Sequence, residues 1–218
     1  QFVSDHLFTS GKGEEGMAGV GFELKKLFRA RTVAGHLKAY SFSVLITTGP
    51  FILLTGMVLA VQLLFWVFHV PLYENHLFVA SSVYAFIFSQ ILSAGFAKVV
   101  TRYVSDCISI ESYRDVTASC FGLITILLLL GSIAAGIFFW HSPLSLLEKM
   151  GAYLFFSLLL TIWAENVYLT ALKKFKALLW GFAAGVSLSV LCVYLLLKTT
   201  AFTPAVSALM GVNMGLAV

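Results

Sequence analysis

The feature that most constrains this chain is a succession of long apolar runs, each close to the length that crosses a membrane. A helix that crosses the hydrocarbon core needs about 20 predominantly apolar residues. Hydrophobic residues make up 60% of the sequence and charged residues only 11%, which excludes an ordinary soluble domain. We expect five complete spans and an unfinished sixth, at about residues 40–68, 77–97, 116–140, 151–172, 177–197 and 201–218.

These runs are predicted to be helices. Hydrocarbon offers no water to the backbone, so only helices or a closed barrel can span it. Barrel strands alternate apolar and polar residues, whereas LITILLLLGSIAAGIFFW at 123–140 shows no alternation. The predicted fold class is an all-α, polytopic transmembrane helical bundle. Because the sixth run is still apolar at Val218, we expect the sequence to be a fragment of a longer protein.

The basic residues predict the orientation, because short cytoplasmic loops carry an excess of Lys and Arg. With the N-terminus in the cytoplasm, twelve of the fourteen basic residues fall on the cytoplasmic side. Only Lys149 and Lys198 fall on the other side. The topology therefore accounts for the net charge of +4, and no nucleic-acid partner is needed to explain it.

The segment before the first span divides in two. GKGEEG at 11–16 matches the GxGxxG spacing of dinucleotide loops, but it neither follows a buried strand nor opens a helix in a βαβ unit, so we do not expect a nucleotide site. Its back-translation is purine-rich, as in a ribosome-binding site ahead of Met17, so residues 1–16 are expected to be a non-native upstream tail. Residues 17–39 are expected to be a cytoplasmic segment with a short amphipathic interfacial helix at 23–31.

Candidate functional side chains cluster near the predicted cytoplasmic side of two spans. Gln90, Lys98 and Arg102 follow at four- or eight-residue steps and so share one helix face, which favours a polar stripe leading to a cytoplasmic mouth. The alternative is that the two cations reach lipid headgroups and that Gln90 bonds a neighbouring helix.

Glu165 is the most exceptional residue in the spans, about 10 Å from the cytoplasmic end of the fourth. Placing a carboxylate within a membrane costs free energy, so such a group usually faces a cavity or a partner. Glu165, with Asn166 beside it, is therefore a candidate for the substrate path or for coupling. The alternative is a structural bond to a basic partner such as Arg102.

Two pairs of residues are expected to act through the helix backbone. Gly49 and Pro50 within the first span should kink or open the helix, either to line a path or as a packing bend. Gly181 and Gly185 have the GxxxG spacing typical of close helix packing.

The sequence indicates neither an enzyme nor a cofactor. His69, His76 and His141 fall at predicted outer loops without acidic or Cys ligand spacing, so we expect no metal site. Three scattered cysteines are expected to be free thiols, and there is no GK[ST] loop for ATP. No nucleophile and base pair stands out at one depth.

Four ordered motifs carry a resemblance to a known family. They are MAGVGFELKKL at 17–27, TTGP at 47–50, VVTRYVSD at 99–106 and LTALKKFKA at 169–177. On these motifs the chain resembles the N-terminal half of PelG-family transporters of the Pel exopolysaccharide system.

The resemblance implies a carrier similar to the MATE and oligosaccharidyl-lipid flippase superfamily, with two six-helix halves around a central cavity. It implies Pel export across the bacterial inner membrane during biofilm matrix production. The implied partners are the polysaccharide, the lipid bilayer, a cytoplasmic glycosyltransferase, other Pel membrane subunits and the protein's own C-terminal half. A neutral residue is expected in the family where this chain has Glu165, so the resemblance gives Glu165 no role. Alternatives are a cation-coupled drug or lipid-linked sugar exporter, or a non-transporting scaffold that docks a glycosyltransferase.

Overall fold

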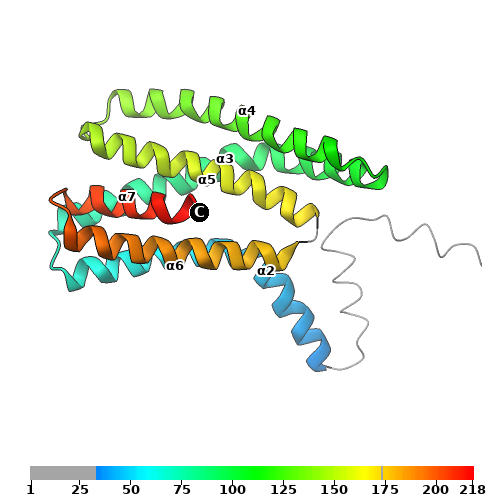
Figure 1. Ribbon diagram of the computed structural model, residues 1–218, viewed down its shortest axis with the longest axis horizontal. Helices are drawn as coiled ribbons and strands as arrows, with labels where there is room; N and C mark the ends of the chain where they lie inside the picture. The colour runs from blue at the N-terminus through cyan, green and yellow to red at the C-terminus, as the bar shows by residue number, and fades with distance from the viewer. Residues whose placement is uncertain (1–32, 173) are drawn as a thin grey trace, which may run out of the picture.

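The structure is a computed structural model that describes residues 33–172 and 174–218 (Figure 1). Over these residues its regular structure is entirely helical, which confirms the predicted fold class. The helices are α2 (Val33–Val67), α3 (Leu72–Ser109), α4 (Tyr113–Trp140), α5 (Leu146–Ala171), α6 (Phe175–Thr199) and α7 (Pro204–Leu216). The upstream tail predicted at 1–16 and the interfacial helix predicted at 23–31 lie outside the described residues.

Five helices, α2 to α6, are long and apolar enough to cross a membrane, and α7 is a shorter apolar helix of 13 residues. The chain is a multi-pass membrane protein. One helix is much longer than its apolar run: α3 continues to Ser109, although the run ends before Lys98. A helix satisfies its own backbone hydrogen bonds, so it need not end where the apolar residues end.

The links between helices gather at two ends of the bundle (Figure 1). We call one the Trp140 end, where residues 68–71, 141–145 and 200–203 connect the helices. The opposite Arg114 end holds residues 110–112 and residues 172 and 174. The part of helix α4 from Arg114 to Trp140 has 27 residues, which is about 40 Å at 1.5 Å per residue. That length matches a bilayer with its headgroups, about 40–45 Å.

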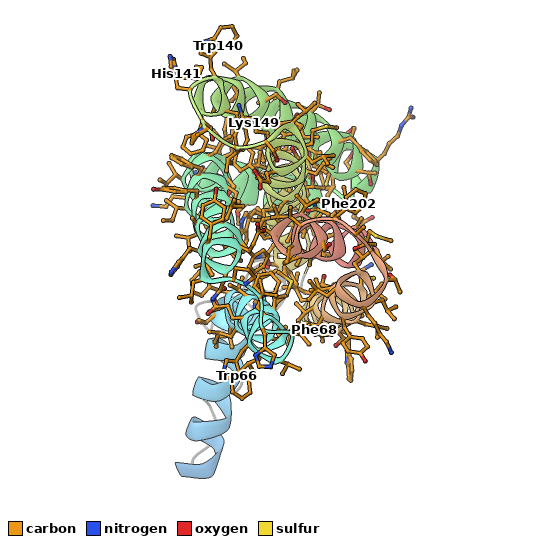
Figure 2. All side chains as sticks on the ribbon, turned by 90° about the vertical axis from the view of Figure 1, so that its left-hand side faces the viewer. Trp66, Phe68, Trp140, His141, Lys149 and Phe202 are labelled. Carbon is orange, nitrogen blue, oxygen red and sulfur yellow. The ribbon has the colours of Figure 1, made fainter. Side chains whose placement is uncertain are left out.

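Large aromatic side chains mark the Trp140 end. Trp66 and Trp140 are 78% and 81% exposed, and Figure 2 looks onto this end with both of them labelled. Near the other end, Trp180 of α6 is also exposed. Tryptophan is enriched where hydrocarbon meets headgroups. Its position near both ends is therefore typical of a bundle that crosses the bilayer along its long axis.

Helix α5 lies at the centre of the bundle and packs against α3, α4, α6 and α7. Its buried side chains include Phe155, Leu159 and Leu160, all fully or almost fully buried. They join the main apolar core with residues of α2, α3, α6 and α7. A second, smaller core holds α3, α4 and α5 together near the Arg114 end, through Val104, Leu127 and their neighbours.

Helix α2 contains Pro50, and both Pro50 and Gly49 are buried. Figure 1 shows the N-terminal, blue part of α2 turned away from the direction of the rest of the helix. A bend is the expected effect of a proline inside a helix, because proline lacks an N–H and its ring collides with the preceding turn.

The closest helix approach is between α6 and α7. A Cβ on Gly211 would lie 2.7 Å from the backbone nitrogen of Val193, and one on Gly215 would overlap the backbone of Ser189. Gly211 and Gly215 have the same spacing as the Gly181 and Gly185 pair that was expected to pack, and they make the tight contact instead. A Cβ on Gly185 would make only ordinary contacts with α7, and one on Gly181 would meet no described atom within 4 Å.

Candidate functional site

A polar groove lies along α3 toward the Arg114 end, in the part of the helix that continues beyond its apolar run. The groove has a volume of about 550 Å³, and its lining is Ala97, Lys98, Thr101, Arg102, Ser105 and Asp106. Its residues repeat at three- and four-residue steps, which places them on one face of the helix. The structure therefore brings two of the predicted site residues, Lys98 and Arg102, into one groove.

Both cations of the groove are exposed, and neither forms an ion pair with a described acidic residue. The carboxylate of Asp106 lines the same groove and has no ion-pair partner in the part of the chain that the structure describes. The groove thus presents hydroxyl groups, one carboxylate and two cations that have no ion-pair partner among the described residues. Such a surface suits a hydroxyl-rich ligand, which hydrogen-bonds to Lys and Arg donors and to the carboxylate.

Gln90 lies two turns before Lys98, at the middle of α3. Its side chain is half-buried and makes no hydrogen bond with a described residue. The hydroxyl of Ser93 bonds the carbonyl of Gln90 at 3.2 Å, within the same helix. No bond between the Gln90 side chain and a neighbouring helix is present in the described residues, so its amide is available to another group.

Glu165 projects from the Arg114 half of α5. Its side chain is exposed and forms no hydrogen bond or ion pair with a described residue. The bond to Arg102 that was an alternative from the sequence is therefore absent, and Glu165 does not line the α3 groove. Its neighbour Asn166 is half-buried and accepts a hydrogen bond from Thr170 at 3.3 Å, which ties that amide to its own helix.

Three hydrogen bonds join side chains of α5 to side chains of α3 and α4, and sequence reasoning missed the residues that form them. Trp163 donates its ring N–H to Ser89 of α3 at 3.1 Å. Tyr168 donates to Ser119 of α4 at 3.0 Å, and the Tyr153 hydroxyl lies 2.7 Å from that of Ser132. Small hydroxyl residues are common within apolar spans, so only the facing helix shows which of them bond across.

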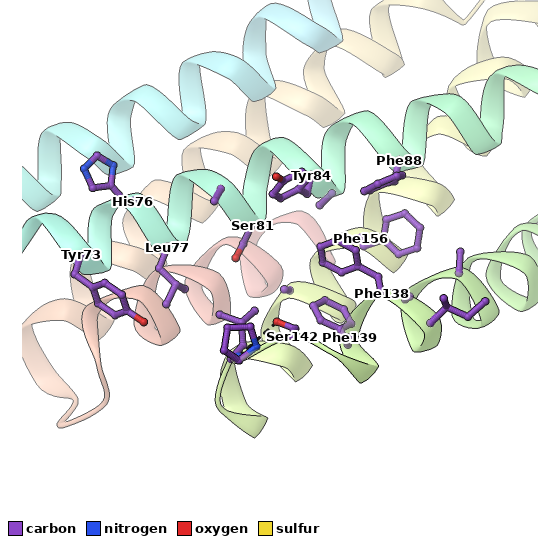
Figure 3. Close-up of a pocket in the computed structure, with 18 residues that line it drawn as sticks. Tyr73, His76, Leu77, Ser81, Tyr84, Phe88, Phe138, Phe139, Ser142 and Phe156 are labelled. Atoms are coloured by element: carbon purple, nitrogen blue, oxygen red, sulfur yellow. Dashed lines mark hydrogen bonds between the residues drawn. The ribbon is translucent and has the colours of Figure 1, made fainter.

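A second, larger cavity lies toward the Trp140 end, between α3, α4 and α5. Its volume is about 750 Å³ and aromatic side chains dominate its lining (Figure 3). It shares no residue with the α3 groove. The described part of the chain thus carries a small polar groove at one end and a large apolar cavity near the other.

The described residues contain no group of three metal-ligating side chains. His76 lines the apolar cavity, whereas His69 and His141 line neither of the two cavities. Cys107, Cys120 and Cys192 are free thiols, as the sequence led us to expect.

The comparisons with known proteins agree with this architecture. Residues 17–218 match the model of the PelG family, whose description is "Putative exopolysaccharide Exporter (EPS-E)". No curated protein and no solved structure matches the chain. The match extends over all of the described helices, and its description is that of an exporter and not of an enzyme. The chain therefore belongs to the PelG family of exopolysaccharide exporters.

Proposed function

We propose that this chain is the N-terminal half of an inner-membrane carrier that exports Pel-type exopolysaccharide for the biofilm matrix. The observation that carries the proposal is the PelG-family match over six helices of which five are long enough to span a membrane. The carrier is proposed to have two MATE-like lobes, and this chain to supply one of them. A cytoplasmic glycosyltransferase and other Pel membrane subunits would supply the growing chain.

The Arg114 end is proposed to face the cytoplasm. Among the residues with described side chains, Lys98, Arg102, Arg114 and Lys174 lie toward this end, and Lys149 and Lys198 lie toward the other. A cytoplasmic excess of basic residues orients membrane proteins in this way. The α3 groove would then open on the side from which polymer arrives.

We propose that the α3 groove is the cytoplasmic mouth of the export path, with Lys98 and Arg102 as its donors and Gln90 as the next polar group inward. Its hydroxyl groups and its two cations, which form no ion pair with a described residue, suit a hydroxyl-rich polymer. Lys and Arg that merely reach headgroups would also be exposed, so exposure does not distinguish the two roles.

A pair of matched arginines tests this mouth. In the full-length protein, Arg102→Ala should lower the amount of secreted polysaccharide more than Arg114→Ala does, with both proteins at equal membrane abundance. Both arginines are exposed at the same end, but only Arg102 lines the groove. Equal export by the two variants would show that Arg102 only contacts headgroups.

Orientation has its own test. Cysteines placed at Ser109 and Lys174, in a background without the native cysteines, should react with a membrane-impermeant thiol reagent only from the cytoplasmic side. Cysteines at Glu74 and Ser142, toward the Trp140 end, should react only from the periplasmic side. Periplasmic reactivity at Lys174 would overturn the proposed topology.

Glu165 is proposed to couple export to proton movement. It lies six residues before the end of α5, about 9 Å along the helix, without a partner among the described residues. A carboxylate at that depth normally faces a polar cavity or a partner. We propose that it faces the path that the remaining part of the protein completes.

Substitution by glutamine tests the coupling role of Glu165. Because the change removes no described ion pair, Glu165→Gln should leave membrane abundance and thermal stability unchanged while export loses its dependence on external pH. Glu111→Gln, in the exposed 110–112 link at the same end, is the control and should keep that dependence. Unchanged pH dependence in Glu165→Gln would exclude coupling through this carboxyl.

A further inference from the structure

The large cavity near the Trp140 end has no part in the proposed export path, and its shape points to another ligand. Figure 3 shows Tyr73 at one end of the α3 side of this cavity and Phe88 at the other. These two residues are 15 positions apart, or about 22 Å along the helix. The depth of one bilayer leaflet with its headgroups is about the same, half of the 40–45 Å that separates the two surfaces.

The lining changes in character along this depth. Near the start of α3 and in the 141–145 link, the polar side chains of Tyr73, His76 and Ser142 line the cavity beside the apolar Leu77, Pro143 and Leu144. Farther along α3 the lining is mostly apolar, with Ala85 and Phe88, and Phe156 of α5 also lines this part. Polar groups near the membrane surface and a mostly apolar interior toward the midplane match the two parts of a phospholipid.

Aromatic rings explain why α3 and α4 leave this space. The ring of Phe138 on α4 meets Tyr84 and Phe88 of α3 with centroids 5.7 and 5.9 Å apart. These rings bridge the two helices, and the small side chains of Ala134 and Ala135 on α4 line the same cavity. The aromatic rings therefore keep α3 and α4 apart, and the small alanine side chains do not fill the cavity between them.

The cavity is open to the side of the described bundle. Tyr84, Phe88 and Phe138 are 51%, 47% and 44% exposed although they line it. In a bilayer, the molecules at this depth are lipid acyl chains. Water is a poor occupant because an apolar cavity stays dry, and a sugar would lose hydrogen bonds to water that the few polar groups here could not replace.

We propose that this cavity is a phospholipid site, in which one acyl chain lies between α3, α4 and α5 and the headgroup lies against Tyr73, His76 and Ser142. Its volume of about 750 Å³ is within the range of roughly 300–1,000 Å³ of ligand pockets. Phospholipid binding in this cavity does not depend on polysaccharide export, so an experiment on lipid binding tests it.

The experiment uses the full-length protein in phosphatidylethanolamine vesicles that contain a phospholipid with a photoactivatable diazirine on one acyl chain. After illumination, mass spectrometry locates the labelled peptides. We expect labelling of Phe88 and Phe156 to exceed that of Leu191 and Leu195, which are exposed on α6 and line neither cavity. Labelling no stronger than that of α6 shows only ordinary boundary lipid and overturns the proposal. Absence of labelling, as when another segment of the protein fills the cavity, also overturns it.

A cavity-filling substitution makes the test specific. Ala134→Phe places a ring inside the cavity and should lower cavity labelling about tenfold, the effect of losing about two methylene contacts. Gly136→Phe is the matched control, because Gly136 lies at nearly the same depth of α4, is exposed, and lines neither cavity. Its cavity labelling should equal that of the wild type. Unchanged labelling in Ala134→Phe overturns the proposal.

Thermal unfolding checks that both variants fold. Should Ala134→Phe not fold, Ala80→Phe fills the same cavity from α3, where Ala80 is exposed and has room for a larger side chain. The same fall in cavity labelling, with α6 labelling unchanged, is expected from it.

Discussion

The α6–α7 pair and the α3–α4 pair show two opposite ways in which neighbouring helices of one bundle can meet. Between α6 and α7 the backbones nearly touch, at Gly211 against Val193 and at Gly215 against Ser189. Between α3 and α4, in the half near Trp140, contact is made through rings whose centroids are 5.7 to 5.9 Å apart. Helices in lipid gain little from hiding apolar surface, so the size of the facing side chains decides how closely they pack.

The difference has a functional consequence. The glycine contact leaves no room for a ligand, and the α6–α7 pair can serve as a rigid wall of the bundle. The ring contact leaves a cavity on one side of α3, while the long polar continuation of the same helix forms a groove at the opposite end. Helix α3 therefore carries both candidate binding surfaces.

The largest effect is expected from a methyl group in the glycine contact. Gly215→Ala places a Cβ on the backbone of Ser189, which cannot yield as a flexible side chain would. The helices must move apart, and overpacking of this kind costs about 1–3 kcal/mol. The free energy of unfolding, measured by SDS titration in mixed micelles, should fall by that amount. An unchanged value would mean that α6 and α7 are farther apart than described here.

A smaller effect is expected where the helices already stand apart. Phe138→Ala removes the contacts of the Phe138 ring with Tyr84 and Phe88. Each aromatic pair contributes about 0.5–1.5 kcal/mol to the free energy of unfolding. Because Phe138 is 44% exposed and borders an existing cavity, its loss should cost about 1 kcal/mol, less than the roughly 3–5 kcal/mol of a fully buried Phe. The same SDS titration measures it. A loss as large as that of a buried Phe would mean that the cavity is closed in solution.

The spans could be predicted from the sequence because hydropathy reports directly which residues lipid tolerates. Apolar runs placed five crossing helices correctly, since backbone groups in lipid have few other ways to be satisfied. The end of α3 could not be predicted in this way, because past Lys98 the helix packs Val104 and Cys107 against α4 and α5, which hydropathy along one helix does not report.

The site was only partly predictable. Four-residue spacing indicated that Lys98 and Arg102 share a face, and they line one groove. Lys98, Arg102 and Glu165 have no ion-pair partner among the described residues, and this depends on which helices face them. Spacing along one helix does not contain that information. The cavity near Trp140 is formed by residues from 73 to 156 whose meeting only the packing of three helices reveals.

The last prediction concerns the glycine pair at 181 and 185, where a Cβ on Gly185 would make only ordinary contacts with α7. Gly181 and Gly185 have the same spacing as Gly211 and Gly215, yet a Cβ on Gly181 would meet no described atom within 4 Å. Within a helix, glycine is less stable than alanine by roughly 0.5–1 kcal/mol, because it loses more backbone freedom on folding. Gly181→Ala should therefore raise the free energy of unfolding by up to that amount in the same SDS titration, opposite in sign to Gly215→Ala. The two variants differ only in which glycine of the α6–α7 pair gains a methyl group, so each is the control for the other. A destabilised Gly181→Ala would show that this face of α6 packs against a part of the protein outside the described residues, and the pattern at 181 and 185 would then mark a second interface.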